Sequence, residues 1–261
     1  MTPSTTPGTR SLKAKVRAVQ RLLIEAYGLP ARPIWAGTVG LIDPAEARSD
    51  WAPIDPLDEL INTILSQNTN DLNRDRAYRA LRLAFPTWEA VRDAPTKAVV
   101  ETIKPAGLAN QKGPRIQKVL ERITAERGEL DIRFLADLPV PEAKAWLTSL
   151  DGVGPKTAAI VLLFALGKAA FPVDTHIHRV TGRLGLIPPK TTADQAHEIL
   201  EALVPPEWYH PFHLLVIQHG RKVCKAQRPL CEICSLQKHC DDYQQRRAGK
   251  NNPRMDANKR E

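Results

Sequence analysis

The sequence predicts an all-α protein of 261 residues. Three observations predict this class. From Pro56 onward, apolar residues recur at spacings of three and four in one segment after another, which is the period of an amphipathic helix. Pro or Gly stands at most of the joints between these segments. The alternation of apolar and polar residues that marks a strand is almost absent.

The expected helices follow one another with short connections. A disordered tail is expected at 1–10, a basic amphipathic helix at 11–26, and a Pro-rich extended connection at 28–56. Further helices are expected at 58–66, 71–85, 87–93, 96–104, 112–127, 141–149, 155–166, 175–184, 192–204 and 208–223. The charged segment 241–261 has no apolar period, so it is expected to be a flexible tail.

Composition restricts the functional class. Lys plus Arg is 37 and Asp plus Glu is 29, which gives a net charge of +8 and favours a polyanionic partner such as nucleic acid. The longest apolar run, 158–166, is far shorter than the roughly 20 residues of a membrane span. Residues 1–10 lack the apolar centre of a signal peptide. We therefore expect a cytoplasmic protein, associated with the nucleoid if its source is prokaryotic.

All four cysteines of the chain lie close together, with the spacing C-x6-C-x2-C-x5-C at Cys224, Cys231, Cys234 and Cys240. In an intracellular protein this clustering indicates a metal site rather than disulfides. Four thiolates suit either a tetrahedral zinc ion or an iron–sulfur cluster, and the residues alone leave both open. The loop after the first cysteine contains Lys225 and Arg228, which are candidates for DNA phosphate contacts or, equally, for a solvated loop.

A glycine-containing turn separates two of the apolar helices. Gly152 and Gly154 permit a tight turn, Val153 is expected to pack inward, and Pro155 suits the start of the next helix. Backbone N–H groups at such a turn can hold a phosphate, although an ordinary helix connection has the same pattern. Lys156 follows beside an apolar helix wall, so it is a candidate amine nucleophile as well as a candidate surface lysine.

The segment V-D-T-H-I-H-R provides a second candidate. Asp174 is placed to cap the helix that begins at Thr175. A carboxylate held by backbone N–H groups can also stabilise a positive charge that develops on a sugar. His176 and His178 would point to different faces of a helix, so neither is expected to bind a metal.

The order of three motifs, L-x-G-V-G-x-K-T-A, V-D-T-H-I-x-R and the cysteine spacing, resembles the endonuclease III family of DNA glycosylases in the helix-hairpin-helix superfamily. The resemblance runs from about residue 56 to residue 240. Residues 64–71 are also similar to the family's L-S-x-Q-x-T-D stretch, and residues 103–108 to the loop that inserts a wedge into the duplex. Asp151, where the family usually has Pro, and a longer N-terminal region with an insert near 28–48 depart from the pattern.

The resemblance implies two all-α domains with a DNA cleft between them. The first is a six-helix barrel with the helix-hairpin-helix at 49–168, and the second is an iron–sulfur domain built from 11–48 and 169–240. The resemblance also implies that Lys156 is the nucleophile, that Asp174 is the catalytic aspartate and that the four cysteines bind a [4Fe–4S] cluster.

The implied DNA contacts are Gly152, Val153, Gly154, Gln67, Asn68, Leu108, Lys225 and Arg228. The alignment leaves open whether Gln67 or Asn68 fills the gap that a flipped base leaves in the duplex. Asp151 adds a negative charge next to the turn that is expected to hold a phosphate.

The implied activity is that of a bifunctional base-excision-repair glycosylase. It would remove oxidised pyrimidines and nick the abasic site by β-elimination through a Schiff base on Lys156. The expected partner is double-stranded DNA with damaged bases or abasic sites, and the protein is expected to be a monomer without a membrane partner. Two alternatives stay open: a glycosylase specific for mismatched thymine or uracil, and a non-catalytic DNA-binding module. The presence of both Lys156 and Asp174 argues against the second.

Overall fold

The chain forms helices and connecting turns, and no strand occurs in the residues that the structure describes, which are 9–31 and 54–250. This computed structural model confirms the all-α class. None of the helices in these ranges is long and apolar enough to cross a lipid bilayer. The predictions made for 1–8, 32–53 and 251–261 lie outside the described residues.

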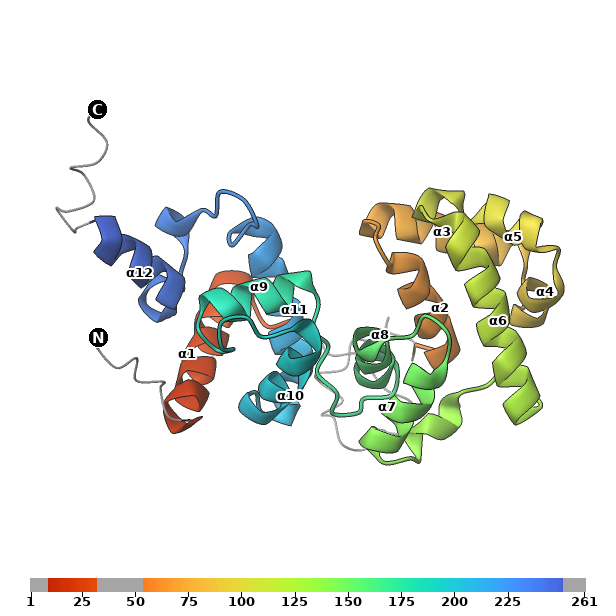
Figure 1. Cartoon of the computed structure of the whole chain (residues 1–261), viewed down its shortest axis with the longest axis horizontal. Helices are drawn as coiled ribbons and strands as arrows, with labels where there is room; N and C mark the ends of the chain where they lie inside the picture. Colours follow the sequence, from red (N-terminus) through yellow and green to blue (C-terminus); the bar gives the residue numbers. More distant parts are fainter. Residues whose placement is uncertain (1–8, 32–53, 251–261) are drawn as a thin grey trace. The chain divides into compact units, whose positions relative to one another are not determined.

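The structure divides into two compact units, whose helices are coloured along the sequence in Figure 1. One unit combines both ends of the chain, Met1–Arg32 and Val173–Glu261, and the other is the continuous stretch Pro33–Pro172. The division falls between Pro172 and Val173, so the two candidate catalytic residues, Lys156 and Asp174, belong to different units.

The continuous unit contains seven α-helices in its described part. They are α2 (Pro56–Ser66), α3 (Asp71–Ala84), α4 (Trp88–Asp93), α5 (Thr96–Thr102), α6 (Ala109–Arg127), α7 (Val140–Ser149) and α8 (Pro155–Ile160). The apolar pattern predicts the same seven segments, whereas the resemblance implies a six-helix barrel, and Pro95, which lacks an N–H group, separates the short helices α4 and α5. The helix expected at 155–166 changes to π winding over Val161–Ala165.

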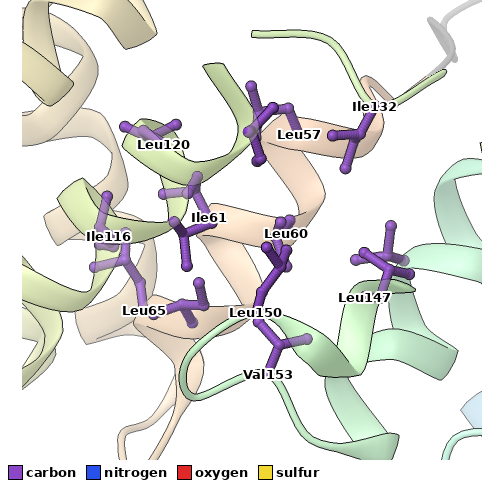
Figure 2. Close-up of a cluster of buried hydrophobic side chains, with 14 of the residues drawn as sticks. Leu57, Leu60, Ile61, Leu65, Ile116, Leu120, Ile132, Leu147, Leu150 and Val153 are labelled. Atoms are coloured by element: carbon purple, nitrogen blue, oxygen red, sulfur yellow. The ribbon is translucent and has the colours of Figure 1, made fainter. Parts of the chain in front are cut away.

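Helix α2 lies at the centre of this unit. Seven of its eleven residues are buried, and its first turn is capped by Asp55, whose carboxylate accepts from the backbone N–H groups of Leu57 and Asp58. Figure 2 shows apolar side chains of α2 and α6 together with residues of the α7–α8 hairpin, which belong to one hydrophobic cluster. Leu150 and Val153, on either side of the turn in this hairpin, are buried in that cluster. Their burial ties the glycine turn to the core.

The other unit contains five α-helices in its described part. They are α1 (Thr9–Tyr27), α9 (Thr175–Arg183), α10 (Ala193–Leu203), α11 (Tyr209–Lys222) and α12 (Asp241–Lys250). Helix α11 packs against both α9 and α1. Helix α10 begins with a capping box, in which the side chains of Thr192 and Gln195 accept from each other's backbone N–H groups.

Helix α12 corrects the expectation of a flexible tail from residue 241 onward. Asp241 and Asp242 lie in its first turn, where negative charge is favourable, and Arg246 forms an i,i+4 ion pair with Asp242 at 2.6 Å. Asp241 also pairs with Lys15 of α1 at 2.6 Å. These polar interactions support the helix, although its sequence lacks an apolar period. At the other end of the chain, α1 begins at Thr9, inside the expected tail.

Candidate functional site

The hairpin turn between α7 and α8 has the geometry that its glycines predicted. Gly152 has φ 71°, in the left-handed region, and Gly154 caps α8 with extended backbone. Val153 is only 4% exposed, so it packs inward as expected. Pro155 occupies the first position of α8. The N–H groups at the start of this helix have no partner within it and are available for an anion.

A second reason for glycine at position 152 comes from the neighbouring helix. A Cβ atom there would lie 2.1 Å from Nε of Arg115 in α6. Arg115 Nη1 donates to Oε1 of Gln67 at 3.4 Å, and Gln67 Nε2 donates to the carbonyl oxygen of Gly152 at 3.1 Å. The side chain of Gln67 therefore joins the end of α2 to the hairpin turn. Sequence spacing could not predict this contact, because it joins residues 85 positions apart.

Asn68 and Leu108 differ from Gln67 in their backbone and exposure. Both side chains are exposed, and both residues have positive φ, 52° for Asn68 and 50° for Leu108. This region is unfavourable for a residue with a Cβ by roughly 1–2 kcal/mol. Gly107, at φ 67°, turns the chain directly before Leu108 and the start of α6. The structure thus presents two exposed side chains on constrained backbone.

Lys156 lies in the first turn of α8 and is exposed. Within the described residues, its ammonium group takes part in no hydrogen bond or ion pair. The three residues that follow it, Thr157, Ala158 and Ala159, are buried. The amine is therefore accessible to a ligand beside the hairpin turn, and the buried residues that follow it hold the start of α8 in the core.

Asp174 caps α9, as its position predicted. Its Oδ1 accepts a hydrogen bond from the backbone N–H of Ile177 at 2.7 Å, and the side chain is half-buried. His176 and His178 make separate contacts: Nδ1 of His176 lies 3.0 Å from Arg179, and Nε2 of His178 lies 2.7 Å from the carbonyl oxygen of Thr191. These contacts are consistent with two structural histidines.

The four cysteines line one pocket of about 320 Å³, part of it open to solvent. Other lining residues come from α9, α12 and the loop between α11 and α12. Burial raises the pKa of Cys234 to about 11 and that of Cys240 in the same direction. No group of three or more His, Cys, Asp or Glu side chains in the described residues converges closely enough to hold a single metal ion.

Arg183 holds the loop between the first two cysteines. Its guanidinium donates to the carbonyl oxygens of Lys225 at 2.6 Å and Ala226 at 2.9 Å, and to Sγ of Cys224 at 3.3 Å. Arg228 in the same loop is exposed and has φ 49°. Arg183 was not among the residues singled out in the sequence, because an arginine at the end of an amphipathic helix has no local signal for such a contact.

His219 is a further residue whose neighbours the sequence did not reveal. It is buried in α11, and its Nε2 lies 3.5 Å from Sγ of Cys234. Its Nδ1 lies 3.0 Å from the hydroxyl oxygen of Tyr27 in α1. Burial lowers the pKa of His219 to about 4. This histidine therefore links the wall of the cysteine pocket to the first helix of the chain.

Comparison with known proteins assigns the stretch that contains the hairpin and Asp174 to a family. The model of a family described as "HhH-GPD superfamily base excision DNA repair protein" matches residues 61–206, more than half of the chain. The chain therefore belongs to the helix-hairpin-helix superfamily of base excision DNA repair proteins.

Individual relatives narrow the assignment. The endonuclease III of Thermotoga maritima is 35% identical over 195 residues, which are 75% of this chain and 87% of that protein. A solved non-covalent endonuclease III–DNA complex has a TM-score of 0.71 and 25% identity, and covers 90% of this chain and 98% of its own. A trapped covalent intermediate of endonuclease III with DNA has a TM-score of 0.70 and 26% identity, with the same coverage. The chain is thus a DNA glycosylase of the endonuclease III family, as its motifs predicted.

Proposed function

We propose that this protein is a bifunctional glycosylase that excises oxidised pyrimidines from double-stranded DNA and then cleaves the abasic strand by β-elimination. The observation that carries the proposal is the exposed ammonium of Lys156, which has no partner in the described part of the chain and follows directly after the hairpin turn. A primary amine in this place suits nucleophilic chemistry on DNA. The relative captured as a covalent intermediate supports the same chemistry for the family.

The damaged nucleotide must first leave the base stack, which costs a few kcal/mol and least for a damaged base. Leu108 and Asn68 are exposed on constrained backbone, so we assign them to the space that the flipped nucleotide vacates. Gln67 is engaged with Gly152 and Arg115, so we assign it to holding the hairpin rather than to filling the gap. The hairpin N–H groups would bind the DNA backbone beside the lesion.

The proposed chemical step uses the neutral amine of Lys156. Its nitrogen attacks C1′ of the sugar, the bond from C1′ to the base breaks, and the base leaves with the bonding electron pair and takes up a proton. The carboxylate of Asp174 stabilises the positive charge that develops on the sugar, and the lysine nitrogen gives up a proton to a base as its bond to C1′ forms. Ring opening gives a Schiff base between Lys156 and C1′, and loss of a proton from C2′ then expels the 3′ phosphate.

We further propose that Cys224, Cys231, Cys234 and Cys240 hold a [4Fe–4S] cluster. The residues fit this group, because four thiols, the ligands that an iron–sulfur cluster takes, line one pocket. A bound cluster would supply four strong bonds that fix the loop of Lys225 and Arg228 for contact with DNA phosphates. The reaction itself uses Lys156 and Asp174.

Borohydride trapping tests the nucleophile. The wild-type protein is expected to form a covalent adduct with abasic DNA in the presence of borohydride, and Lys156→Ala is expected to lose it. Lys97→Ala is the matched control, because Lys97 is also an exposed lysine in the first turn of a short helix. Full trapping by Lys156→Ala would show that another amine is the nucleophile.

A panel of DNA substrates tests the base preference. Excision of thymine glycol and dihydrouracil, with little excision of mismatched thymine or uracil, is the expected result. Preference for the mismatched bases would contradict the proposed substrate while leaving the glycosylase class intact. Binding without excision of any base or cleavage of an abasic site would contradict the catalytic proposal.

A further inference from the structure

Lys112 is an unusual residue in the continuous unit because its whole side chain is buried. It is 1% exposed and is the bulkiest of the fully buried side chains in the described residues. It lies in the first turns of α6. Its Nζ donates to the carbonyl oxygen of Leu65 at 2.8 Å and to that of Ala106 at 2.9 Å. A buried amine therefore joins two segments that are 41 residues apart in the sequence.

These two carbonyl groups precede the two constrained residues described above. Leu65 is in the last turn of α2, three residues before Asn68, and Ala106 is two residues before Leu108. In addition, the backbone N–H of Lys112 donates to the carbonyl oxygen of Leu108 at 3.0 Å. One residue thus makes hydrogen bonds close to both Asn68 and Leu108.

The backbone conformations at these places need support. Left-handed φ values at non-glycine residues persist only where the surrounding structure holds them. The last turn of α2 and the short 3₁₀ turn at Lys104–Ala106 are both C-terminal ends of helical segments, where carbonyl groups lack partners within the helix. The ammonium of Lys112 satisfies one such carbonyl group in each of them.

This arrangement is a costly way to build a core. Burial of an amine without a carboxylate partner is unfavourable, and burial lowers the pKa of Lys112 to about 8. Within the described residues, Lys112 has no ion pair that offsets the cost. An apolar side chain would fill the same space without the desolvation penalty. What the lysine provides in addition is two hydrogen bonds that hold the carbonyl groups of Leu65 and Ala106 in place.

We propose that Lys112 is a positioning residue that clamps the Asn68 and Leu108 segments to each other, so that both side chains enter the opened duplex at a set spacing. The role of these side chains in DNA rests on the proposed function, whereas the clamp itself is a property of the free protein. The two parts are therefore tested by different measurements.

Hydrogen exchange tests the clamp in the free protein. Lys112→Met keeps a long side chain but removes both donated bonds. Gln117→Met is the matched control: Gln117 lies in the same helix, is 5% exposed, and its Nε2 donates to the carbonyl oxygens of Val91 and Ala94, away from both segments. Lys112→Met is expected to speed amide exchange in 66–70 and 104–111 together, and Gln117→Met in neither. Unchanged exchange, or a change in only one segment, would overturn the clamp. If Lys112→Met does not fold, Lys112→Gln is measured against the same control.

Single-turnover excision tests the consequence for DNA. With thymine glycol opposite adenine, Lys112→Met is expected to be slower than Gln117→Met by about tenfold or more, because misplacement of an ångström has effects of this size. With thymine glycol opposite a tetrahydrofuran, where no partner base must be displaced, the two variants are expected to be equal. An equal loss on both substrates would show general damage and overturn the positioning role. If the wild-type protein excises no base, the proposed function fails, and exchange alone decides on the clamp.

Discussion

The amide group of Gln67 connects the end of α2 to the carbonyl oxygen of Gly152, at 3.1 Å from Nε2, and receives a hydrogen bond from Arg115 on its other side. The adjacent Asn68 is exposed. Gln67 is thus hydrogen-bonded to the hairpin, whereas Asn68 is exposed, so we expect the first to stabilise the fold and the second to contact DNA.

Substitution of each residue should therefore have a different effect. Gln67→Ala is expected to lower the free energy of unfolding by about 1 kcal/mol, because it removes a hydrogen bond to a turn with few other partners. Asn68→Gly removes the side chain and relieves the positive φ, so stability should be unchanged or slightly higher. Excision of a paired lesion should nevertheless fall in Asn68→Gly. Thermal unfolding and single-turnover excision check both variants, and a stability loss confined to Asn68→Gly would contradict the assignment.

The two glycines of the hairpin should respond differently to alanine. Gly152→Ala combines a positive φ with a Cβ placed 2.1 Å from the Arg115 side chain, and it is expected to cost about 1–3 kcal/mol and to weaken DNA binding. Gly154→Ala has ordinary φ and no atom within 4 Å of the added Cβ, so it is expected to be tolerated. Chemical denaturation measures the free energy of unfolding of both variants. Arg115→Ala added to Gly152→Ala should recover the part of the loss that is steric, and no recovery would show that backbone strain accounts for all of it.

Asp174 has a structural role in the fold and a proposed chemical role, and two substitutions separate them. Asn is as good a helix cap as Asp, so Asp174→Asn should keep the hydrogen bond from Ile177 and the wild-type melting temperature. Asp174→Ala should lose about 1 kcal/mol. Both variants should lose base excision. Wild-type excision by Asp174→Asn would show that residue 174 acts only as a helix cap and that its negative charge is not needed.

Glu59 predicts a pH dependence of stability. Burial raises its pKa from 4.5 to about 7, and the hydroxyl of Thr63 donates to it at 3.2 Å. The folded state therefore binds the Glu59 proton more tightly than the unfolded chain does. The favourable contribution of the protonated form is complete below about pH 4.5 and is lost as pH rises through 7.

Glu59→Gln cannot ionise, so it avoids this loss. At pH 8 the variant is expected to be more stable than wild type by about 2 kcal/mol, and the difference should shrink toward zero near pH 5. Urea denaturation across this range gives the comparison, and Glu25→Gln, at an exposed glutamate of α1, is the control. A difference that is independent of pH would show that Glu59 titrates normally.

Removal of the cysteine ligands tests the proposed cluster. Purified wild-type protein is expected to show visible absorption together with iron and acid-labile sulfide, and Cys234→Ser should lose part or all of each. The substitution should also raise hydrogen exchange in the loop of Lys225 and Arg228, because ligand bonds contribute to folding. One zinc ion per chain and no visible absorption would contradict the iron–sulfur assignment.

The helices could be predicted from sequence because their signals are local. The apolar period placed the observed helices to within a few residues, the cap at Asp174 followed from its position before Thr175, and glycines marked the hairpin turn. Each signal depends on residues within one or two turns of each other. Helix α12 was missed because first-turn charges, an i,i+4 pair and a contact with Lys15 support it in place of an apolar face.

The sequence by itself thus determined the helical class, the order of the motifs and the residues available for chemistry and for thiolate ligation. Only the tertiary structure decided that Gln67 holds the hairpin, that Lys112 is buried between two strained segments, and that Arg183 fixes the cysteine loop. The physical reason is that each of these side chains is bonded to backbone carbonyl groups of distant residues. Every residue has such a carbonyl group, so the amino-acid type of a residue does not indicate which side chain will donate to it. Only the packing of the helices decides which carbonyl group each side chain reaches.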